Sequence, residues 1–319
     1  MTKGAVVAQC IDKEMIIMKK IISIIKNPSR IGLRLLRMFG WMFSDRMFLK
    51  IQFRLKMGYP LNLDNPQTYN EKLQWLKLYN RRSEYTKMVD KYEVKKYVAS
   101  IIGEEHIIPT LGLWDRFEDI DLDQLPSQFV LKTTNGGGGG GVVVCKDKAM
   151  LDKKKTKRII ERSLRSNIYR GFKEWPYKNV KPRIIAEKYM EDESGELRDY
   201  KFYCFNGVPQ IIMVANDRSS GNVTFDYFDM QFNHLPYQQG ALNSKFSVQK
   251  PENFEKMRQL AAQLSSSGYL PHIRVDLYNC SGKVFFGELT FFDASGYAEF
   301  KPFEWDRKLG DMIDLKKID

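Results

Sequence analysis

Six consecutive glycines, Gly136 to Gly141, lie between two apolar stretches, FVLK at 129–132 and VVVC at 142–145. Glycine loses the most conformational freedom on folding, so such a run weakens a helix or strand and favours a loop. A loop without side chains can turn its N–H groups toward phosphate oxygens, and Lys132 adds a positive charge beside it. A Walker A loop differs, because its Lys-Ser/Thr follows the glycines. The pattern predicts a phosphate-binding hairpin; a flexible linker is the weaker alternative, because linkers usually join domains and carry more serine.

Two carboxylates, Asp276 in RVDLY and Glu288 in FGELT, lie on the two arms of the last predicted hairpin, around a turn at 280–282. With a three-residue turn and a left-handed Gly282, we expect Arg274 to face Glu288. Asp276 and Glu288 then project from the same face as diagonal neighbours. Two carboxylates without a nearby histidine suit a Mg²⁺ ion that also binds phosphate. A surface hairpin with charge pairs is the alternative, but the apolar surroundings favour a buried pair with a partner.

The segment RIIAEKYMEDESGELRDYKF, residues 183–202, separates these two motifs. Its apolar strand could offer backbone groups to adenine, its acids could bind a ribose hydroxyl, and Lys201 could reach phosphates from the opposite wall. The alternative is an ordinary alternating strand with Asp199 and Lys201 on one exposed face.

Composition excludes several other chemistries. The four cysteines are scattered without a CxxC pair, and the three histidines lack zinc-ligand spacing. A disulfide framework is therefore not expected, and any metal would be a hard cation bound by carboxylates. No GxSxG-type elbow supports a serine hydrolase.

The net charge of +12 is concentrated near the start of the chain, where residues 15–57 hold ten Lys/Arg and one acid, Asp45. No apolar run there approaches the roughly 20 residues that span a bilayer. The pattern favours amphipathic helices on an anionic membrane face or an acidic polymer, or equally helices that pack on the main domain with a solvated basic face. Charge alone allows nucleic-acid binding, but no RRM, KH or helix-turn-helix pattern accompanies it, so none is expected.

The elements that position these residues alternate between helix and strand. Thr68 and Glu71 have the spacing of a capping box at a helix start, and a second helix is expected over 83–100. Residues 106–114 predict a short buried strand, and Asn206-Gly207 predicts a hairpin turn. This order predicts an α+β protein built on antiparallel sheet.

Eight motifs, in order, resemble the ATP-grasp ligases, specifically the TupA-like branch associated with teichuronopeptide and other surface-polysaccharide synthesis. They lie between about Tyr59 and Leu315: LDNPQTYNEKLQWLKLY, MVDKYEVKKYV, HIIPTLGLW, FVLKTTNGGGGGG, IIAEKYM, RDYKFYCFNG, IRVDLY and GELTFF. The resemblance implies an α+β ATP-grasp fold, in which two α+β subdomains clamp a nucleotide after a mostly helical basic region. The expected segments are 1–58 (basic amphipathic region), 59–125 (N-terminal domain), 126–190 (glycine-loop subdomain) and 191–319 (C-terminal subdomain with the metal site).

The resemblance also implies roles for single residues. ATP phosphates would meet Lys91, Lys132, Lys201 and the loop residues Asn135, Gly136, Gly137, Gly138 and Gly139. Adenine would bind at Glu187, Lys188, Tyr189 and Met190, and ribose at Glu191 or Asp192. Mg²⁺ would be held by Asp276, Glu288 and Thr290, where Thr290 replaces the asparagine of the family's Glu-x-Asn pattern and still offers one oxygen. Arg274 would stabilise the acyl phosphate or the departing phosphate, and the loop 293–296 would lie near the acceptor.

The implied function is ATP- and Mg²⁺-dependent ligation of a carboxylate to an amine through an acyl phosphate, forming an amide on a bacterial surface polysaccharide or its precursor. The expected partners are an anionic or lipid-linked glycan and an amine-bearing small molecule, an amino acid or amino sugar. The expected location is the cytoplasm, with 15–57 as a candidate for peripheral contact with the inner membrane face. The alternatives are a sugar or polysaccharide kinase, a glycosyltransferase-like enzyme, and a non-catalytic membrane-proximal scaffold.

Overall fold

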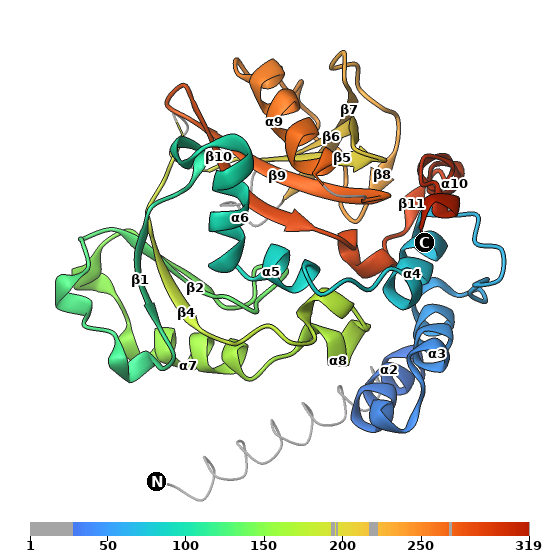
Figure 1. The fold of residues 1–319 in the computed structure, drawn as a ribbon, viewed down its shortest axis with the longest axis horizontal. Coiled ribbons are helices and arrows are strands. Elements are labelled where there is room, and N and C mark those ends of the chain that lie inside the picture. The colour runs from blue at the N-terminus through green and yellow to red at the C-terminus, as the bar shows by residue number, and fades with distance from the viewer. Residues whose placement is uncertain (1–27, 193–194, 196, 217–222, 268–269, 319) are drawn as a thin grey trace, which may run out of the picture. The chain divides into compact units, whose positions relative to one another are not determined.

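A computed structural model describes residues 28–192, 195, 197–216, 223–267 and 270–318 (Figure 1). The chain divides into two compact units, one ending at Leu61 and one beginning at Asn62. The finer division into four segments stays a prediction.

The first unit is helical where it is described. Helices α2 (Pro28–Phe39) and α3 (Asp45–Met57) are joined by the 3-10 turn η1 (Gly40–Met42). Ser44 caps α3, and Gly58 ends it in a left-handed conformation at φ 82°. This part of the predicted basic region is therefore helical, while residues 15–27 lie outside the described residues. Within the described residues, no helix is both long and apolar enough to cross a membrane.

A four-stranded antiparallel sheet carries the glycine loop, in the order β1-β4-β2-β3. Its strands are β1 (Thr110–Trp114), β2 (Phe129–Thr133), β3 (Val142–Cys145) and β4 (Ile184–Lys188). Helix α7 (Lys153–Leu164) packs on β2 and β3, where Ile160 joins Phe129 and Leu131 in a buried core. The strand predicted within 106–114 is present as β1, but its predicted burial was wrong, because β1 is an edge strand and only half-buried at best.

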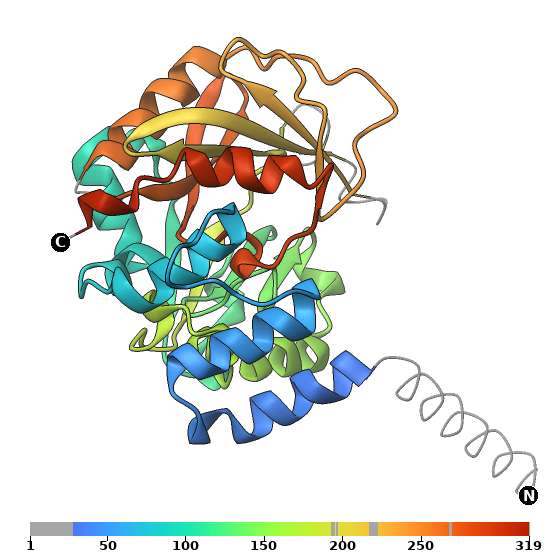
Figure 2. The same ribbon diagram turned by 90° about the vertical axis from the view of Figure 1, so that its right-hand side faces the viewer.

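A five-stranded antiparallel sheet carries the carboxylates, in the order β10-β9-β5-β6-β7. Its strands are β5 (Asp199–Phe205), β6 (Val208–Asn216), β7 (Thr224–Asp229), β9 (His272–Cys280) and β10 (Lys283–Thr290). Helix α9 (Phe254–Ser266) covers one face through β5, β6 and β9 (Figure 2). The predicted Asn206-Gly207 turn is confirmed, with φ of 50° and 83°. A two-stranded ribbon pairs β8 (Gln238–Gln239) with β11 (Phe300–Lys301).

The predicted capping box is present at the start of α4 (Tyr69–Tyr79), and α10 (Glu304–Asp311) packs against this helix (Figure 2). The single helix expected over 83–100 is instead two, α5 (Tyr85–Val89) and α6 (Glu93–Ile102). The break occurs at Asp90, whose carboxylate accepts hydrogen bonds from the N–H groups of Tyr92 and Glu93. The remaining helices are α8 (Ile168–Phe172), η2 (Glu104–His106), η3 (Phe117–Asp119), η4 (Leu122–Gln124), η5 (Lys148–Met150), η6 (Trp175–Tyr177), η7 (Asp293–Gly296) and η8 (Leu315–Lys317).

Candidate functional site

Residues of both larger sheets line a pocket of about 640 Å³ in the second unit. This volume suits a cofactor-sized ligand. Its walls include the glycine loop, β4, the central strands β5 and β9, β10 and η7. The break between α5 and α6 adds Lys91, whose N–H donates to the carbonyl oxygen of Thr134 at 3.2 Å. The break between these two helices, which the sequence pattern did not predict, therefore places Lys91 beside the glycine loop.

The stem of the glycine loop is held by hydrogen bonds, while its tip is exposed. The Thr133 N–H donates to the Gly141 carbonyl at 3.1 Å, and the Thr133 and Ser163 hydroxyls are 2.6 Å apart. Asn135 is buried and donates to carbonyls at the C-terminal end of α7, including that of Ser166 at 2.9 Å. Residues 138–140 are exposed, and Gly138, Gly139 and Gly141 have φ of 62°, 77° and 82°. Only glycine adopts such angles without cost, so the run has a conformational reason at three of its six positions.

Two lysines share one buried carboxylate at this end of the pocket. Glu187 lies 2.6 Å from Lys132 Nζ and 2.5 Å from Lys95 Nζ. Burial alone would raise the pKa of Glu187, but the two lysines together lower it below its ordinary value. Burial, with Lys132 as a like-charged neighbour, lowers the pKa of Lys95 although Glu187 opposes this. Two cations on one anion leave an excess positive charge facing the pocket.

The hairpin of β9 and β10 has a register that differs from the predicted one. Its turn has two residues, Ser281-Gly282 with φ of 49° and 73°, so Cys280 faces Lys283. The register then shifts by one residue between Phe286 and Glu288. Glu288 therefore faces Asp276 directly. The expectation that Arg274 faces Glu288 was wrong: Thr290 lies opposite Arg274.

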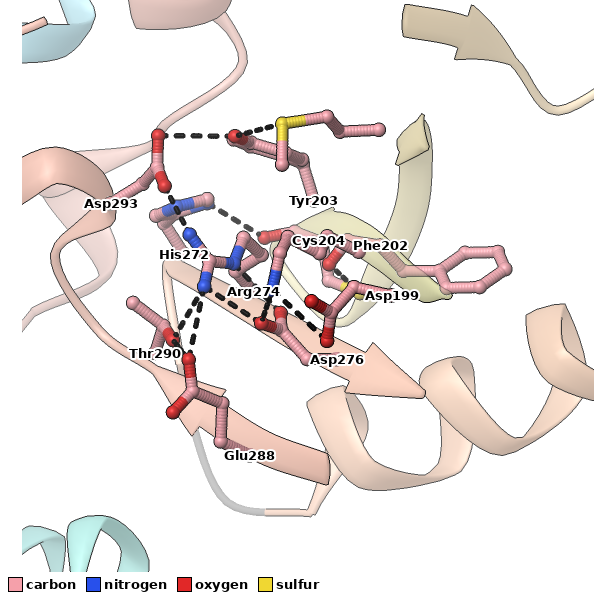
Figure 3. Close-up of polar contacts among 12 residues, drawn as sticks. Asp199, Phe202, Tyr203, Cys204, His272, Arg274, Asp276, Glu288, Thr290 and Asp293 are labelled. Atoms are coloured by element: carbon pink, nitrogen blue, oxygen red, sulfur yellow. Dashed lines mark hydrogen bonds and ion pairs between the residues drawn. The ribbon is translucent and has the colours of Figure 1, made fainter. Parts of the chain in front are cut away.

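Arg274 links the carboxylates of this hairpin (Figure 3). Its Nε and Nη2 each donate to one oxygen of Asp276 at 2.7 Å, and Nη1 contacts Asp293. The same Nη2 lies 3.2 Å from Glu288 Oε1 and 3.1 Å from Thr290 Oγ1. All three side chains predicted to bind Mg²⁺ thus converge on one guanidinium nitrogen.

Lysines complete this ion cluster. Lys201 lies opposite Asp276 in the register of β5 and β9 and forms an ion pair with it. Lys91 Nζ is 3.5 Å from Glu288 Oε2. Burial would raise the pKa of Glu288, but Lys91, Lys201 and Arg274 lower it far below its ordinary value, whereas burial raises the pKa of Asp276 despite its cationic neighbours. Glu288 is the member of the pair that lines the pocket, and 38% of its side chain is exposed.

The donor set fits a hard divalent cation only in part. Two carboxylates and a hydroxyl all contact Arg274 Nη2, so three oxygen groups of the kind that Mg²⁺ binds lie close together. Within the described ranges, no cluster of three or more His, Cys, Asp or Glu side chains could hold a metal ion by itself. A bound Mg²⁺ would therefore take its remaining ligands from phosphate oxygens and water, which is the usual practice of this ion.

The other end of the pocket is lined by η7 and the strands behind it. Asp293 and Ala294 lie in the segment where an acceptor loop was expected. Ala294 and Ser295 have left-handed φ of 45° and 55°, which cost energy for residues other than glycine. Gln74 Nε2 and Lys77 Nζ hold this turn by donating to the Ser295 carbonyl at 3.1 and 2.8 Å. The aromatic residues Tyr203, Phe225 and Tyr227 form the adjacent wall.

The structure brings most of the predicted site residues together. Those that line the pocket are Lys91, Lys132, Gly136, Gly138, Gly139, Glu187, Lys201, Arg274 and Glu288. Asp276 and Thr290 contact these residues without lining the pocket, and Gly137 lies against Ile168. Lys188 ends β4, and Tyr189, Met190, Glu191 and Asp192 follow it. None of the five lines the pocket, so their adenine and ribose contacts stay predictions.

Lys95 and Gln239 are among the pocket residues that the sequence analysis did not single out. Lys95 follows Lys91 by four residues, a spacing that places side chains on one helical face and could have indicated it. Gln239 lies in a two-residue strand within a loop, where no motif marks it.

The chain was compared with known protein families and solved structures. The TupA-like ATPgrasp family matches residues 71–314. Similar solved structures include D-alanine–D-alanine ligase from Bacillus anthracis complexed with ATP (17% identity, 71% of this chain and 63% of that chain, TM-score 0.39). N5-carboxyaminoimidazole synthetase from Staphylococcus aureus (14%, 64% and 44%, 0.37) and D-cycloserine synthetase DcsG (13%, 72% and 71%, 0.38) are also similar. The chain thus spans less than two thirds of the first two of these proteins, and no curated protein matches it. Since the family match covers most of the chain, this protein belongs to the TupA-like ATP-grasp family and has the α+β ATP-grasp fold.

Proposed function

We propose that this protein is an ATP-dependent carboxylate–amine ligase that works through an acyl phosphate. One observation carries the proposal: Lys91, Lys95, Lys132, Lys201 and Arg274 come from separate parts of the chain and line one pocket beneath a glycine loop. Cations gathered beneath a glycine loop suit a nucleoside triphosphate and a carboxylate better than they suit a neutral sugar.

In this proposal, cations on two walls of the pocket bind the phosphates of ATP. Lys132 and the loop N–H groups bind from the glycine-loop sheet, and Lys91 and Lys201 bind from the opposite side. Lys132 reaches phosphate at little cost because Lys95 keeps Glu187 neutralised. Asp276 and Glu288 would hold Mg²⁺, with Thr290 beside them; when bound, the ion neutralises charge on the phosphate oxygens.

The reaction has two steps. The substrate carboxylate attacks the γ-phosphorus of ATP, so an acyl phosphate forms and ADP leaves. The amine then attacks the acyl carbon, phosphate departs, and the amine loses its proton to give the amide. Arg274 and Lys201 stabilise the charge on the transferring phosphoryl group. The exposed glycine tip, residues 138–140, closes over the phosphates and keeps water from the acyl phosphate.

The carboxylate substrate is proposed to belong to an acidic surface glycan or its lipid-linked precursor, and the amine to an amino acid or amino sugar. The chain's net charge of +12 supports an anionic substrate. A kinase would instead leave a phosphorylated glycan and no amide, and a glycosyltransferase would consume a nucleotide-sugar without ATP.

The test measures ADP and phosphate release with pairs of uronic acids and amines. Release that requires both substrates supports the ligase, whereas AMP and pyrophosphate would refute it. Asp276→Asn and Glu288→Gln are expected to lower the rate at least about 100-fold, since each removes charge stabilisation. Glu255→Gln on the exposed face of α9 is the matched control. Unchanged turnover in both site variants would refute the roles given to Asp276 and Glu288. Glycan modification in cells that neither variant affects would favour a non-catalytic scaffold.

We also propose that the first unit binds an anionic membrane surface. Eight large apolar side chains of 31–47 are exposed, and Trp41 (81%), Met42 (63%) and Met38 (58%) are the most exposed of them. The described part of this unit up to Met57 holds seven cations and one acid, Asp45. Apolar side chains beside cations suit the interface of a lipid bilayer that carries negative headgroups.

Vesicle flotation tests this surface. The full chain should bind phosphatidylcholine vesicles containing phosphatidylglycerol and bind pure phosphatidylcholine weakly. Trp41→Ser with Met42→Ser should lower binding at least about tenfold, because both lose apolar burial. Met150→Ser, whose side chain is 81% exposed in the other unit, is the matched control. Equal binding to both vesicle types, or by all variants, would contradict the proposal.

A further inference from the structure

Gln239 lies at the end of the pocket away from the glycine loop. It pairs with Phe300 of β11, is 3% exposed, and lines the pocket beside Tyr227 and Asp293. Its buried place in a short ribbon gives its side chain few alternative positions. A polar side chain so buried requires hydrogen-bond partners at both of its functional atoms.

The orientation of the Gln239 amide follows from its neighbour. Its Nε2 lies 2.8 Å from Asp293 Oδ2, and a carboxylate can only accept. Arg274 Nη1 contacts the other oxygen of Asp293, Oδ1, and the Tyr203 hydroxyl donates to Oδ2 at 3.0 Å. The amide atom that does not contact Asp293 must therefore be the oxygen, Oε1. It is buried and has no hydrogen-bond partner among the described residues.

No described neighbour of Oε1 donates a hydrogen bond to it. The Tyr227 hydroxyl donates to the backbone carbonyl of Gln239 at 3.0 Å. The groups of Tyr203, Gln239 and Arg274 that donate to Asp293 are already bonded to its two oxygens. Met213, Phe225 and Ala298 complete this part of the pocket as apolar neighbours. A ligand that presents an N–H group would satisfy Oε1, whereas a carboxylate or phosphate would place oxygen against oxygen.

We propose that this end of the pocket binds the amine substrate, and that Gln239 Oε1 accepts a hydrogen bond from its amino group. The inference rests on the proposed ligase function and assigns its two substrates to adjoining parts of one pocket. The carboxylate lies at Lys201 and Arg274, and the amine lies at Gln239. Arg274 and Gln239 both bind Asp293, so the two substrate groups meet across this one side chain. The aromatic wall of Phe225 and Tyr227 favours a cationic amine before it loses its proton.

The experiment titrates amines that lack a carboxylate, glucosamine and alanine methyl ester, into the full chain with ATP and Mg²⁺. Gln239→Leu keeps the size of the side chain and removes the Oε1 acceptor together with the Nε2 donor to Asp293. We expect it to raise the Kd of these amines about tenfold, the effect of losing one hydrogen bond to a charged group. The Kd of ATP should stay unchanged. Gln238→Leu is the matched control, because successive side chains of a strand point to opposite faces and Gln238 does not line the pocket.

The outcomes separate this inference from the ligase proposal. No saturable amine binding by the wild-type protein, or the same Kd in Gln239→Leu, would overturn the amine site even if carboxylate-dependent ADP release is observed. A Gln239-dependent Kd for glucuronate in place of the amines would also overturn it. Selective loss of amine binding supports the site even if no carboxylate yet tested releases ADP.

Discussion

Replacement of Gly141 by alanine should break the stem of the glycine loop. The position has φ 82°, and a left-handed alanine costs about 1–2 kcal/mol. The added Cβ would lie 2.1 Å from Ser163 Oγ and 2.7 Å from Thr133 Oγ1, so the hydrogen bond between these two hydroxyls cannot remain. A disrupted buried hydroxyl pair costs about 1–3 kcal/mol more. We therefore expect the free energy of unfolding to fall by about 2–5 kcal/mol, a large share of the stability of an ordinary domain.

Gly140→Ala is the matched control at the neighbouring glycine. Its φ is outside the left-handed range, and its added Cβ would meet only the Gly137 carbonyl oxygen, at 3.6 Å. We expect a change below about 1 kcal/mol, of either sign. Urea unfolding monitored by circular dichroism measures both variants, and calorimetry measures their ATP affinity. Equal free energies of unfolding for the two variants would refute the described stem and the reason given for its glycines.

Two further predictions concern buried charge. Lys132→Met should weaken ATP binding at least about tenfold and lower the free energy of unfolding by about 1–3 kcal/mol, because Glu187 then keeps only Lys95 as a cationic partner. Adding Glu187→Gln to this variant should restore the free energy of unfolding but not the affinity for ATP. Calorimetry measures the affinity, and urea unfolding measures the stability. Burial lowers the pKa of His272 from 6.5 to about 4, so the unfolded chain binds this proton first as the pH falls. Stability from this group is complete above about pH 6.5 and declines by about 3 kcal/mol toward pH 4, and His272→Gln should remove that part of the slope in urea unfolding.

Local sequence signals predicted the features that depend on neighbouring residues. The capping box of Thr68 and Glu71 and the Asn206-Gly207 turn each depend on residues within four positions. The glycine run predicted a loop between two paired strands, β2 and β3, because only a loop tolerates it. The prediction of a single helix over 83–100 was wrong for a nonlocal reason as well as a local one. Asp90 caps a new helix start, and the Thr134 carbonyl binds the N–H of Lys91 from another part of the chain.

Partners of buried polar groups were not predictable in the same way. Gln239 and Asp293 are 54 residues apart, and they meet only because β8 pairs with β11 after a long excursion of the chain. Lys95 meets Glu187 through a helix and a sheet whose packing no local pattern specifies. Both pairs depend on tertiary arrangement, and Gln239 has no motif around it.

The carboxylate pair shows how a correct conclusion can follow from a wrong register. The actual turn is one residue shorter than the expected one, and the irregularity at Gly287 shifts the pairing by one more residue. Side chains alternate between faces with a period of two, so two shifts of one residue return Asp276 and Glu288 to the same face. The shorter turn alone would have placed Glu288 opposite Val275 and on the other face of the sheet. The bulge is therefore what allows the two carboxylates to share Arg274, and it also turns their relation from diagonal to direct.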